Sequence, residues 1–217
     1  VGTEQRVEPS VGDRLRLQAT GLQGEGRLLS AGDLNLQLAG DFRHDGQLQA
    51  GTDARLSIHG RLSNAGSLQA GRQLRIEAAA LDNRNGASVA ADETQLDIAG
   101  QLDNRGLIDG RLTRITAGVL ANDSTGRIYG DRLVIQARTV QNTGDGHAAP
   151  VIAARQQLDI AAGQISNQEQ ALIFSGGDMV LGGALDATER ATGQAGSLDN
   201  ASARIETLGQ LTLAVDT

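Results

Sequence analysis

An asparagine that follows an apolar residue by two positions recurs along this chain at nearly constant intervals, and no other feature constrains the fold as strongly. The asparagines are Asn64, Asn83, Asn104, Asn122, Asn142 and Asn167. With Phe42-x-His44 as the first copy, subtraction of residue numbers gives spacings of 20, 19, 21, 18, 20 and 25 residues. A period of about 20 residues is typical of solenoids, in which one short unit stacks on the next.

Each unit carries two further apolar segments. A pair of apolar residues flanking one mostly polar residue recurs before the asparagine, as Leu15/Leu17, Leu36/Leu38, Leu56/Ile58, Leu74/Ile76, Leu96/Ile98, Leu133/Ile135, Leu158/Ile160, Met179/Leu181 and Leu211/Leu213. An apolar residue recurs after the asparagine, as Leu48, Leu68, Val89, Ile108, Ile128, Ile152 and Ile173. Alternation with period two indicates strands. The 29 glycines argue against helices, since an interior glycine costs a helix about 1 kcal/mol.

A strand of three to five residues cannot bury its inner face alone, but three such strands can close a coil that stacks on the next coil. We therefore predict an all-β fold, a right-handed parallel β-helix of about ten coils with three short strands per coil. Residues 1–217 are expected to form a single domain. A leucine-rich repeat is the closest rival, but its asparagine follows the second leucine by three residues, whereas Asn104 follows Ile98 by six.

The asparagines have a structural role in such a coil. At a turn, asparagine tolerates the left-handed backbone region and hydrogen-bonds local backbone groups. Repeated once per coil, the amides can also stack into a hydrogen-bonded ladder. Both roles, turn former and ladder, are compatible with the sequence. Because position 44 is histidine and position 187 is alanine, the ladder is expected to fade at both ends.

Composition excludes several kinds of partner and site. The net charge of −7 without a basic patch argues against nucleic acid. No apolar run approaches the roughly 20 residues that cross a bilayer, so we do not expect a membrane-spanning segment. The chain has no cysteine, and His44, His59 and His147 fall in different coils, so no metal site and no cofactor are predicted.

Catalysis deserves separate consideration, because parallel β-helices include carbohydrate-active enzymes that use clustered carboxylates. Asp82 and Asp103 lie beside their asparagines, and Asp97 and Asp159 are expected to face outward from the first strand. Outward charges are usually the solvated side of a strand. Aromatic residues make up 1% of the chain, which leaves little on which a sugar could stack. The sequence therefore predicts no catalytic residues and no enzyme.

Three stretches depart from the repeat. Residues 142–150 and 186–197 exceed the unit and are rich in small residues, so we expect loops that protrude from the solenoid. Each could be a tolerated insertion or a binding loop. In residues 111–118, Leu112 and Ile115 are three positions apart, which predicts a bulge or shift in one strand.

The unit QLDIAGQLDNRGLIDG at residues 95–110 resembles the haemagglutinin repeats of filamentous haemagglutinin and of contact-dependent growth inhibition effectors. These are large exoproteins of two-partner secretion systems in Gram-negative bacteria, and the resemblance covers about residues 12–215. It implies a secreted, non-catalytic shaft segment on the cell surface, within an adhesin or a toxin-delivery protein. The implied partners are neighbouring coils of the same exoprotein, an outer-membrane secretion partner and a target-cell receptor. A binding module that acts through its loops is the alternative, and a carbohydrate-active enzyme is a third.

Overall fold

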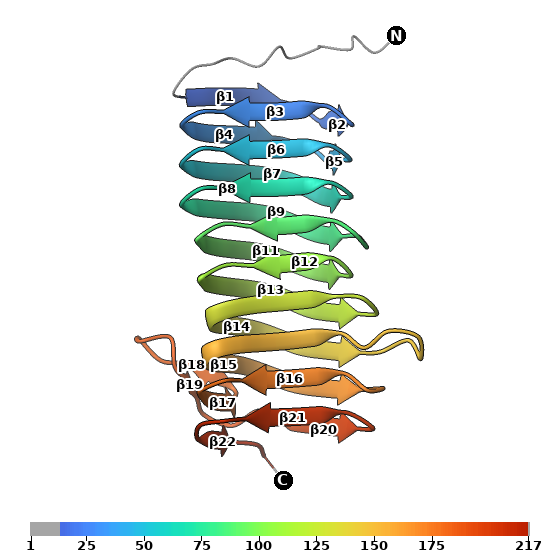
Figure 1. Ribbon diagram of the computed structural model, residues 1–217, viewed down its shortest axis with the longest axis vertical. Helices are drawn as coiled ribbons and strands as arrows, with labels where there is room; N and C mark the ends of the chain where they lie inside the picture. Colours follow the sequence, from blue (N-terminus) through green and yellow to red (C-terminus); the bar gives the residue numbers. More distant parts are fainter. Residues whose placement is uncertain (1–13, 217) are drawn as a thin grey trace.

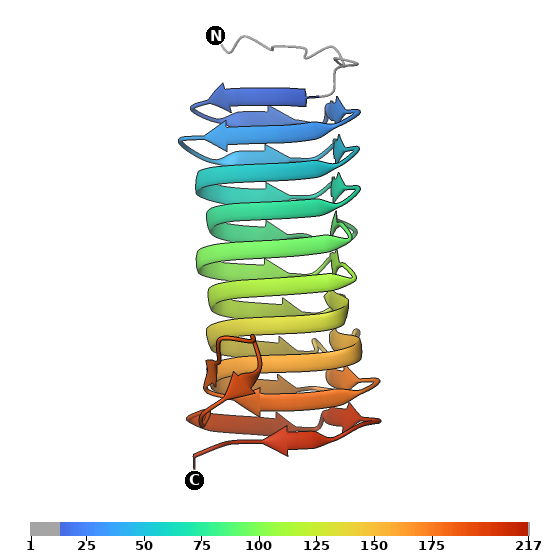
Figure 2. The same ribbon diagram turned by 90° about the vertical axis from the view of Figure 1, so that its left-hand side faces the viewer.

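The strands wind into one elongated solenoid, in which equivalent strands of successive coils pair in parallel (Figures 1 and 2). The computed structural model describes residues 14–216, so residues 1–13 of the predicted domain lie outside the described part. Between residues 14 and 216 the secondary structure is all strand and turn, without a helix. In Figure 1 the chain descends from the N-terminus with the front strands, such as β3 (Arg27–Ser30) and β6 (Gln47–Ala50), running leftward and the strands behind them running rightward, which makes the coil right-handed. The predicted fold class is confirmed.

Each coil contributes to three flat faces. The first face consists of β1 (Arg14–Ala19), β4 (Asp33–Leu38), the opening parts of β7 (Asp53–Asn64), β9 (Gln73–Asn83), β11 (Glu93–Asn104) and β13 (Leu112–Asp123), the middle parts of β14 (Arg127–Thr143) and β15 (Val151–Gln168), β17 (Asp178–Gly182) and β22 (Leu211–Leu213). The second face consists of β2 (Leu22–Gly24), β5 (Phe42–His44), the closing parts of β7, β9, β11, β13, β14 and β15, and β20 (Ser197–Ala201).

The third face consists of β3 (Arg27–Ser30), β6 (Gln47–Ala50), β8 (Ser67–Ala70), β10 (Ser88–Ala90), β12 (Leu107–Asp109), the opening parts of β14 and β15, β16 (Leu172–Ser175) and β21 (Arg204–Thr207). The described residues therefore form nine complete coils and the first strand of a tenth, slightly fewer than predicted. A separate antiparallel hairpin, β18 (Ala184–Leu185) and β19 (Ala191–Thr192), lies outside the coil.

Apolar side chains fill the inside of the coil in columns, with equivalent residues of successive coils on top of one another. On the first face, Leu36, Leu56 and Ile76 pair in register and are fully buried. Burying one such side chain is worth about 2 kcal/mol, so the stacked columns supply most of the stability that single short strands lack. The residues predicted to follow the asparagine form an equivalent column on the third face, from Leu48 to Ile173.

The alignment predicted for the first strand is wrong by two residues in part of the chain. Leu15 and Leu17 pair with Leu34 and Leu36, not with Leu36 and Leu38. The first strand of each coil has three inward positions. The predicted pair of apolar residues falls on the first two of them in some coils and on the last two in others. Since side chains alternate with a period of two, a slip of two residues leaves the same side chains facing inward.

The bulge predicted for residues 111–118 is absent. From Leu112 to Ala117 the strand pairs with both neighbours without interruption. Leu112 points outward, and the buried Thr113 takes the inward position, where its hydroxyl donates to the carbonyl of Tyr129 at 2.7 Å. A hydrogen-bonded threonine replaces an apolar residue here, which explains why the apolar spacing misled the prediction.

Differences in repeat length are absorbed at the corners. Between the first and second faces, β11 shifts register after Ile98 relative to both of its neighbours. The spacing of 25 arises at the next corner, because the segment Gly144 to Pro150 separates Asn142 and Thr143 from the start of β15. The faces thus keep a constant register while the corners vary.

Candidate functional site

The repeated asparagines lie at the corner between the second and third faces, where each is the last inward residue of its second-face strand. Their side chains are fully buried at 0% exposure: Asn64, Asn83, Asn104, Asn122, Asn142 and Asn167. The strand pairing sets all six at the same register position of successive coils. The structure therefore brings all six predicted site residues into one column in the interior of the solenoid.

Each asparagine amide donates two hydrogen bonds to the following coil. One Nδ2 hydrogen bonds to the Oδ1 atom of the next asparagine at 2.8–2.9 Å, in the pairs 64–83, 83–104, 104–122, 122–142 and 142–167. The same Nδ2 also bonds to the carbonyl oxygen that opens the next third-face strand, at 3.1–3.3 Å for Ser88, Leu107, Arg127, Val151 and Leu172. With both donors used and no exposure, these amides have no capacity left to bind a substrate.

The two ends of the ladder differ from each other. His44 is 2% exposed, and its Nε2 lies 3.1 Å from the carbonyl of Ser67, so it takes the backbone contact that an asparagine makes one coil later. At the other end, Ala187 was expected to interrupt the ladder. The residue level with Asn167 is instead Asn200, whose Oδ1 accepts from Asn167 at 2.7 Å. The insertion between Asn167 and Asn200 moves the next member of the ladder from the expected position 187 to position 200.

The carboxylates that could have served an enzyme are mostly paired with arginine. Asp82 contacts Arg84 at 3.1 Å and Arg105 at 2.6 Å, and these residues line a shallow hollow with Asn85. Partial burial of Asp82 acts to raise its pKa, but the hydrogen bonds from the two arginines outweigh burial and lower it. Asp97 pairs with Arg75 at 2.8 Å. Charges compensated in this way are typical of a solvated surface.

One carboxylate beside this hollow behaves differently. Burial raises the pKa of Asp123, and the Asp103 carboxylate raises it further. Asp103 itself pairs in register with Asp82 across β9 and β11. The pKa of Asp123 is thus raised while that of Asp82 is lowered, a pattern that an acid and a base of a hydrolase also show, so this corner is the place to test the catalytic alternative.

Other kinds of site have no counterpart in the described residues. Within residues 14–216, no group of three or more histidine, cysteine, aspartate or glutamate side chains is arranged to hold a metal ion. The same part of the chain contains no helix long and apolar enough to cross a membrane. His59 and His147 are exposed and belong to different coils.

A comparison with family models gives two overlapping matches. Residues 10–66 and 54–106 match the model described as haemagglutinin repeat. Residues 10–106 are thus similar to haemagglutinin repeats. The predicted resemblance is thereby confirmed for this part of the chain, and the asparagine ladder continues the same unit beyond residue 106. Neither the curated proteins nor the solved structures contain a match to the chain.

Both irregular loops lie beyond the matched haemagglutinin repeats. The segment from Gly144 to Pro150 is organised by Asp145, whose carboxylate accepts from the Ser124 hydroxyl at 2.6 Å and from the amides of Ala148 at 2.8 Å and His147 at 2.9 Å. These hydrogen bonds, the Ser124 bond foremost, lower the pKa of Asp145 to about 2. The loop is therefore shaped by one ionised side chain.

The second insertion folds back onto the coil. Residues 183–196, the covering loop, include the β18–β19 hairpin and lie over the outer side of the first face (Figures 1 and 2). Arg114 donates from Nε to both carboxylate oxygens of Glu189, at 2.7 and 2.9 Å. Arg132 donates to the carbonyls of Thr188 at 2.8 Å and Glu189 at 3.3 Å. The loop thus contacts β13, three coils before it, and β14, two coils before it.

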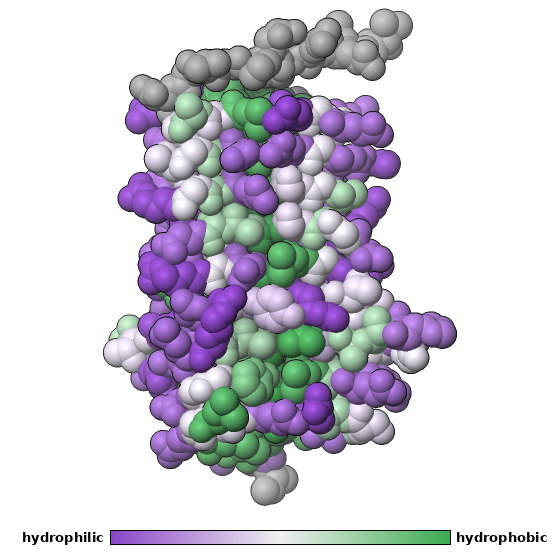
Figure 3. Space-filling model, in the orientation of Figure 1, coloured by the Kyte–Doolittle hydropathy of each residue, from purple (hydrophilic) through white to green (hydrophobic). Residues whose placement is uncertain are grey.

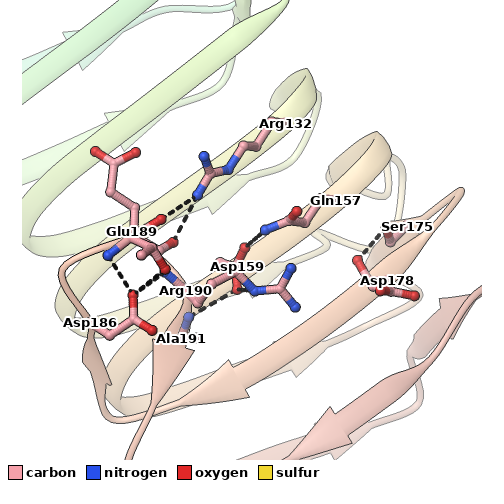
Figure 4. Close-up of polar contacts among 10 residues, drawn as sticks. Arg132, Gln157, Asp159, Ser175, Asp178, Asp186, Glu189, Arg190 and Ala191 are labelled. Carbon is pink, nitrogen blue, oxygen red and sulfur yellow. Dashed lines mark hydrogen bonds and ion pairs between the residues drawn. The ribbon is translucent and has the colours of Figure 1, made fainter.

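Asp159 anchors the covering loop at its centre (Figure 4). Its side chain is 0% exposed, and its Oδ1 accepts from the Ala191 amide at 2.9 Å and lies 3.4 Å from Nε of Arg190. Gln157 donates to the other oxygen. Asp159 does point away from the core, as predicted, but the loop buries it, so the expected solvent exposure was wrong.

Sequence reasoning missed the residues that receive this loop. Val134 and Ala161 are apolar at outward positions of the first face, and they are buried beneath the loop at 3% and 1% exposure. At Gly183 a Cβ atom would lie 2.0 Å from the carbonyl oxygen of Gln194, so only glycine permits the close approach. The apolar residues at these outward positions were the sequence signal that could have predicted a covering segment.

Proposed function

We propose that this chain is a non-catalytic segment of the shaft of a secreted cell-surface filament. The observation that carries the proposal is that the side chains which recur from coil to coil face the interior. The asparagines recur in successive coils from Asn64 onward, the apolar columns run along the same coils, and these side chains point inward, where they bond to or pack on the next coil. Side chains that recur in this way serve the stacking of one coil on the next, and the number of stacked coils sets the length of the segment.

The cellular setting rests on the haemagglutinin repeat match and on the resemblance given by the sequence. Export through an outer-membrane partner of a Gram-negative bacterium fits a β-solenoid with haemagglutinin repeats. Within such an exoprotein the immediate partners of the segment are the coils before and after it. Whether the parent is an adhesin or a toxin carrier, the segment's contribution is the distance over which it presents another part.

The alternative of a binding module is supported by one loop more than by the other. Residues 144–150 project from a corner, with His147 exposed, and could contact a receptor or glycan. Residues 186–197 were expected to do the same, but most of this stretch lies in the covering loop and packs on the molecule's own surface. A receptor site would therefore be expected at residues 144–150.

The experiment that separates a shaft from a catalytic site uses the parent exoprotein on living cells. A variant with Asp82→Asn, Asp103→Asn and Asp123→Asn removes the three carboxylates of this corner. We expect surface display and adhesion or toxin delivery at the level of the unmodified protein. A correctly displayed variant that has lost function would contradict the shaft proposal. Replacement of residues 145–149 by a short glycine-serine segment tests the binding alternative in the same assay.

A further inference from the structure

The outer surface of the third face changes character along the molecule. In β6, β8 and β10 the outward side chains are Gln47, Gln49, Ser67, Gln69, Ser88 and Ala90. From β12 to β16 most outward side chains become apolar, and six of them form what we call the apolar patch: Leu107, Tyr129, Val151, Ala153, Leu172 and Phe174. Figure 3 shows green side chains gathered over β14, β15 and β16 on this face.

The first face offers an internal comparison. There, the outward apolar residues Val134 and Ala161 are buried by the covering loop. All six residues of the apolar patch keep partial exposure. Outward positions of a solvated strand are normally polar, and contiguous exposed apolar side chains on a soluble protein mark an interaction surface. The patch therefore indicates a binding partner outside the described chain.

Outward residues of the third face stand in two columns, because every second residue of each strand faces outward. The column nearer the asparagine corner contains Leu107, Arg127, Val151, Leu172 and Arg204. The other column contains Asp109, Tyr129, Ala153, Phe174 and Glu206. The patch thus ends, in the last coil, at a basic residue in one column and an acidic residue in the other.

We infer that the apolar patch binds the same patch of a second copy of this chain, with the two coil axes parallel. A twofold axis along the coil direction sets each column against the other column of the partner at the same level. Leu172 then meets Phe174 of the partner subunit, and Arg204 meets Glu206 of the partner subunit. Arg127 likewise lies opposite Tyr129 of the partner subunit, a pairing that favours a cation over a ring.

Charge decides between this arrangement and the antiparallel one. With antiparallel axes centred on the level of Val151, each column would face itself, and Glu206 would meet Asp109 of the partner subunit. Like charges in contact oppose association. Arg204 and Glu206 are exposed, with side-chain exposures of 66% and 48%, and lie 3.3 Å apart within one chain. They are therefore accessible to exchange partners across the interface.

The association state of the whole chain provides the test. Sedimentation velocity over a wide concentration range should show a reversible dimer, and Phe174→Glu should raise its dissociation constant at least tenfold. Gln69→Glu is the matched control, since Gln69 occupies the same column on the polar half, and it should leave the dimer intact. Circular dichroism verifies that both variants are folded. A chain that stays monomeric at every concentration, or a dimer that Phe174→Glu does not weaken, overturns the inference.

Two further variants exclude other dimers. Leu213→Glu alters the open edge of the last coil, where Leu213 is 48% exposed, and would disrupt end-to-end association but not the lateral dimer. The chain has no cysteine, so Asp109→Cys gives a single cross-linking position. In the parallel dimer the two copies of this position lie about 12 Å apart, against about 22 Å in the antiparallel one. Cross-linking by a bismaleimide just long enough to span the shorter of these two distances is expected, and its failure in a folded dimer overturns the parallel arrangement.

Discussion

Each buried asparagine from Asn83 to Asn167 accepts one hydrogen bond from the asparagine of the coil before it and donates two to the coil after it. For Asn104 the donor is Asn83, and the acceptors are Asn122 and the carbonyl of Arg127. A buried polar group is tolerated only when its hydrogen bonds are made, so one missing amide leaves polar atoms unpaired in two neighbouring coils. The ladder therefore fixes the register of one coil on the next, a role we propose for all six residues.

Asn104→Ala should lower the free energy of unfolding by about 2–4 kcal/mol, because it leaves buried donors and acceptors unsatisfied. The matched control is Asn85→Ala, which removes an exposed turn asparagine from the same corner and should cost no more than about 0.5 kcal/mol. Chemical denaturation of the purified chain measures both values. Similar losses at the two positions would show that the ladder contributes no more than a turn does.

His44 makes the first coils sensitive to pH. Burial lowers its pKa in the folded state, although contacts with Ser67, Asp45 and Gly46 act in the opposite direction. The unfolded chain then binds a proton more readily than the folded chain. The stability that His44 contributes is complete above the unfolded pKa of about 6.5 and is lost as the pH falls below it.

Hydrogen exchange of β5 and β7 should therefore accelerate at pH 5 relative to pH 7.5, beyond the intrinsic change in exchange rate. His44→Asn should abolish that difference, because an amide does not titrate in this range. His59→Asn, at an exposed position of β7, should leave the difference unchanged. If the His44→Asn chain kept the full pH dependence, another group would have to be responsible.

At the scale of elements, the covering loop ties β13, β14, β15 and β17 together from outside. Its contacts are charged or use the backbone, and the central one, Asp159 with Arg190 and the Ala191 amide, is shielded from solvent. Removing one partner of a buried, hydrogen-bonded charge is costly, because the remaining groups stay desolvated. The loop should consequently open when its anchor is removed.

Asp159→Ala is expected to destabilise the chain by about 2–4 kcal/mol and to make residues 183–196 susceptible to protease. Asp97→Ala is the matched control, since Asp97 is another outward carboxylate of the first face but stays partly exposed beside Arg75. Its cost should stay within about 0.5 kcal/mol. Limited proteolysis and denaturation together test both effects. An intact loop in the Asp159→Ala chain would contradict the anchoring role.

Regular elements were predictable from this sequence, and contacts between distant segments were not. The asparagine spacing and the period-two alternation depend on neighbours within one coil, so strands, faces and fold class followed from them. The covering loop reaches Arg114 from Glu189, which lies 75 residues away, and nothing local marks such a pairing. Ala187 was misplaced for the same reason, because the length of the insertion concealed that Asn200 is the next member of the ladder.

The whole molecule is a rod because every coil repeats the same contacts with its neighbours. Adjacent strands lie about 4.8 Å apart, so each added coil lengthens the rod by that amount. Stability in such an array is close to a sum of coil and interface contributions. A shaft built in this way tolerates the loss of a complete coil but not of part of one.

Deletion of residues 84–104 joins Asn83 to Arg105 and removes one complete coil, since Asn83 and Asn104 occupy the same position of adjacent coils. Deletion of residues 84–93 removes about half a coil and sets turn residues against strands. Small-angle scattering measures the length of each folded product, and denaturation measures its cooperativity. We predict that the whole-coil deletion stays cooperatively folded and shorter by about 4.8 Å, whereas the half-coil deletion loses its cooperative transition. Equal disruption by both deletions would contradict the account of interchangeable coils that set the length of a shaft.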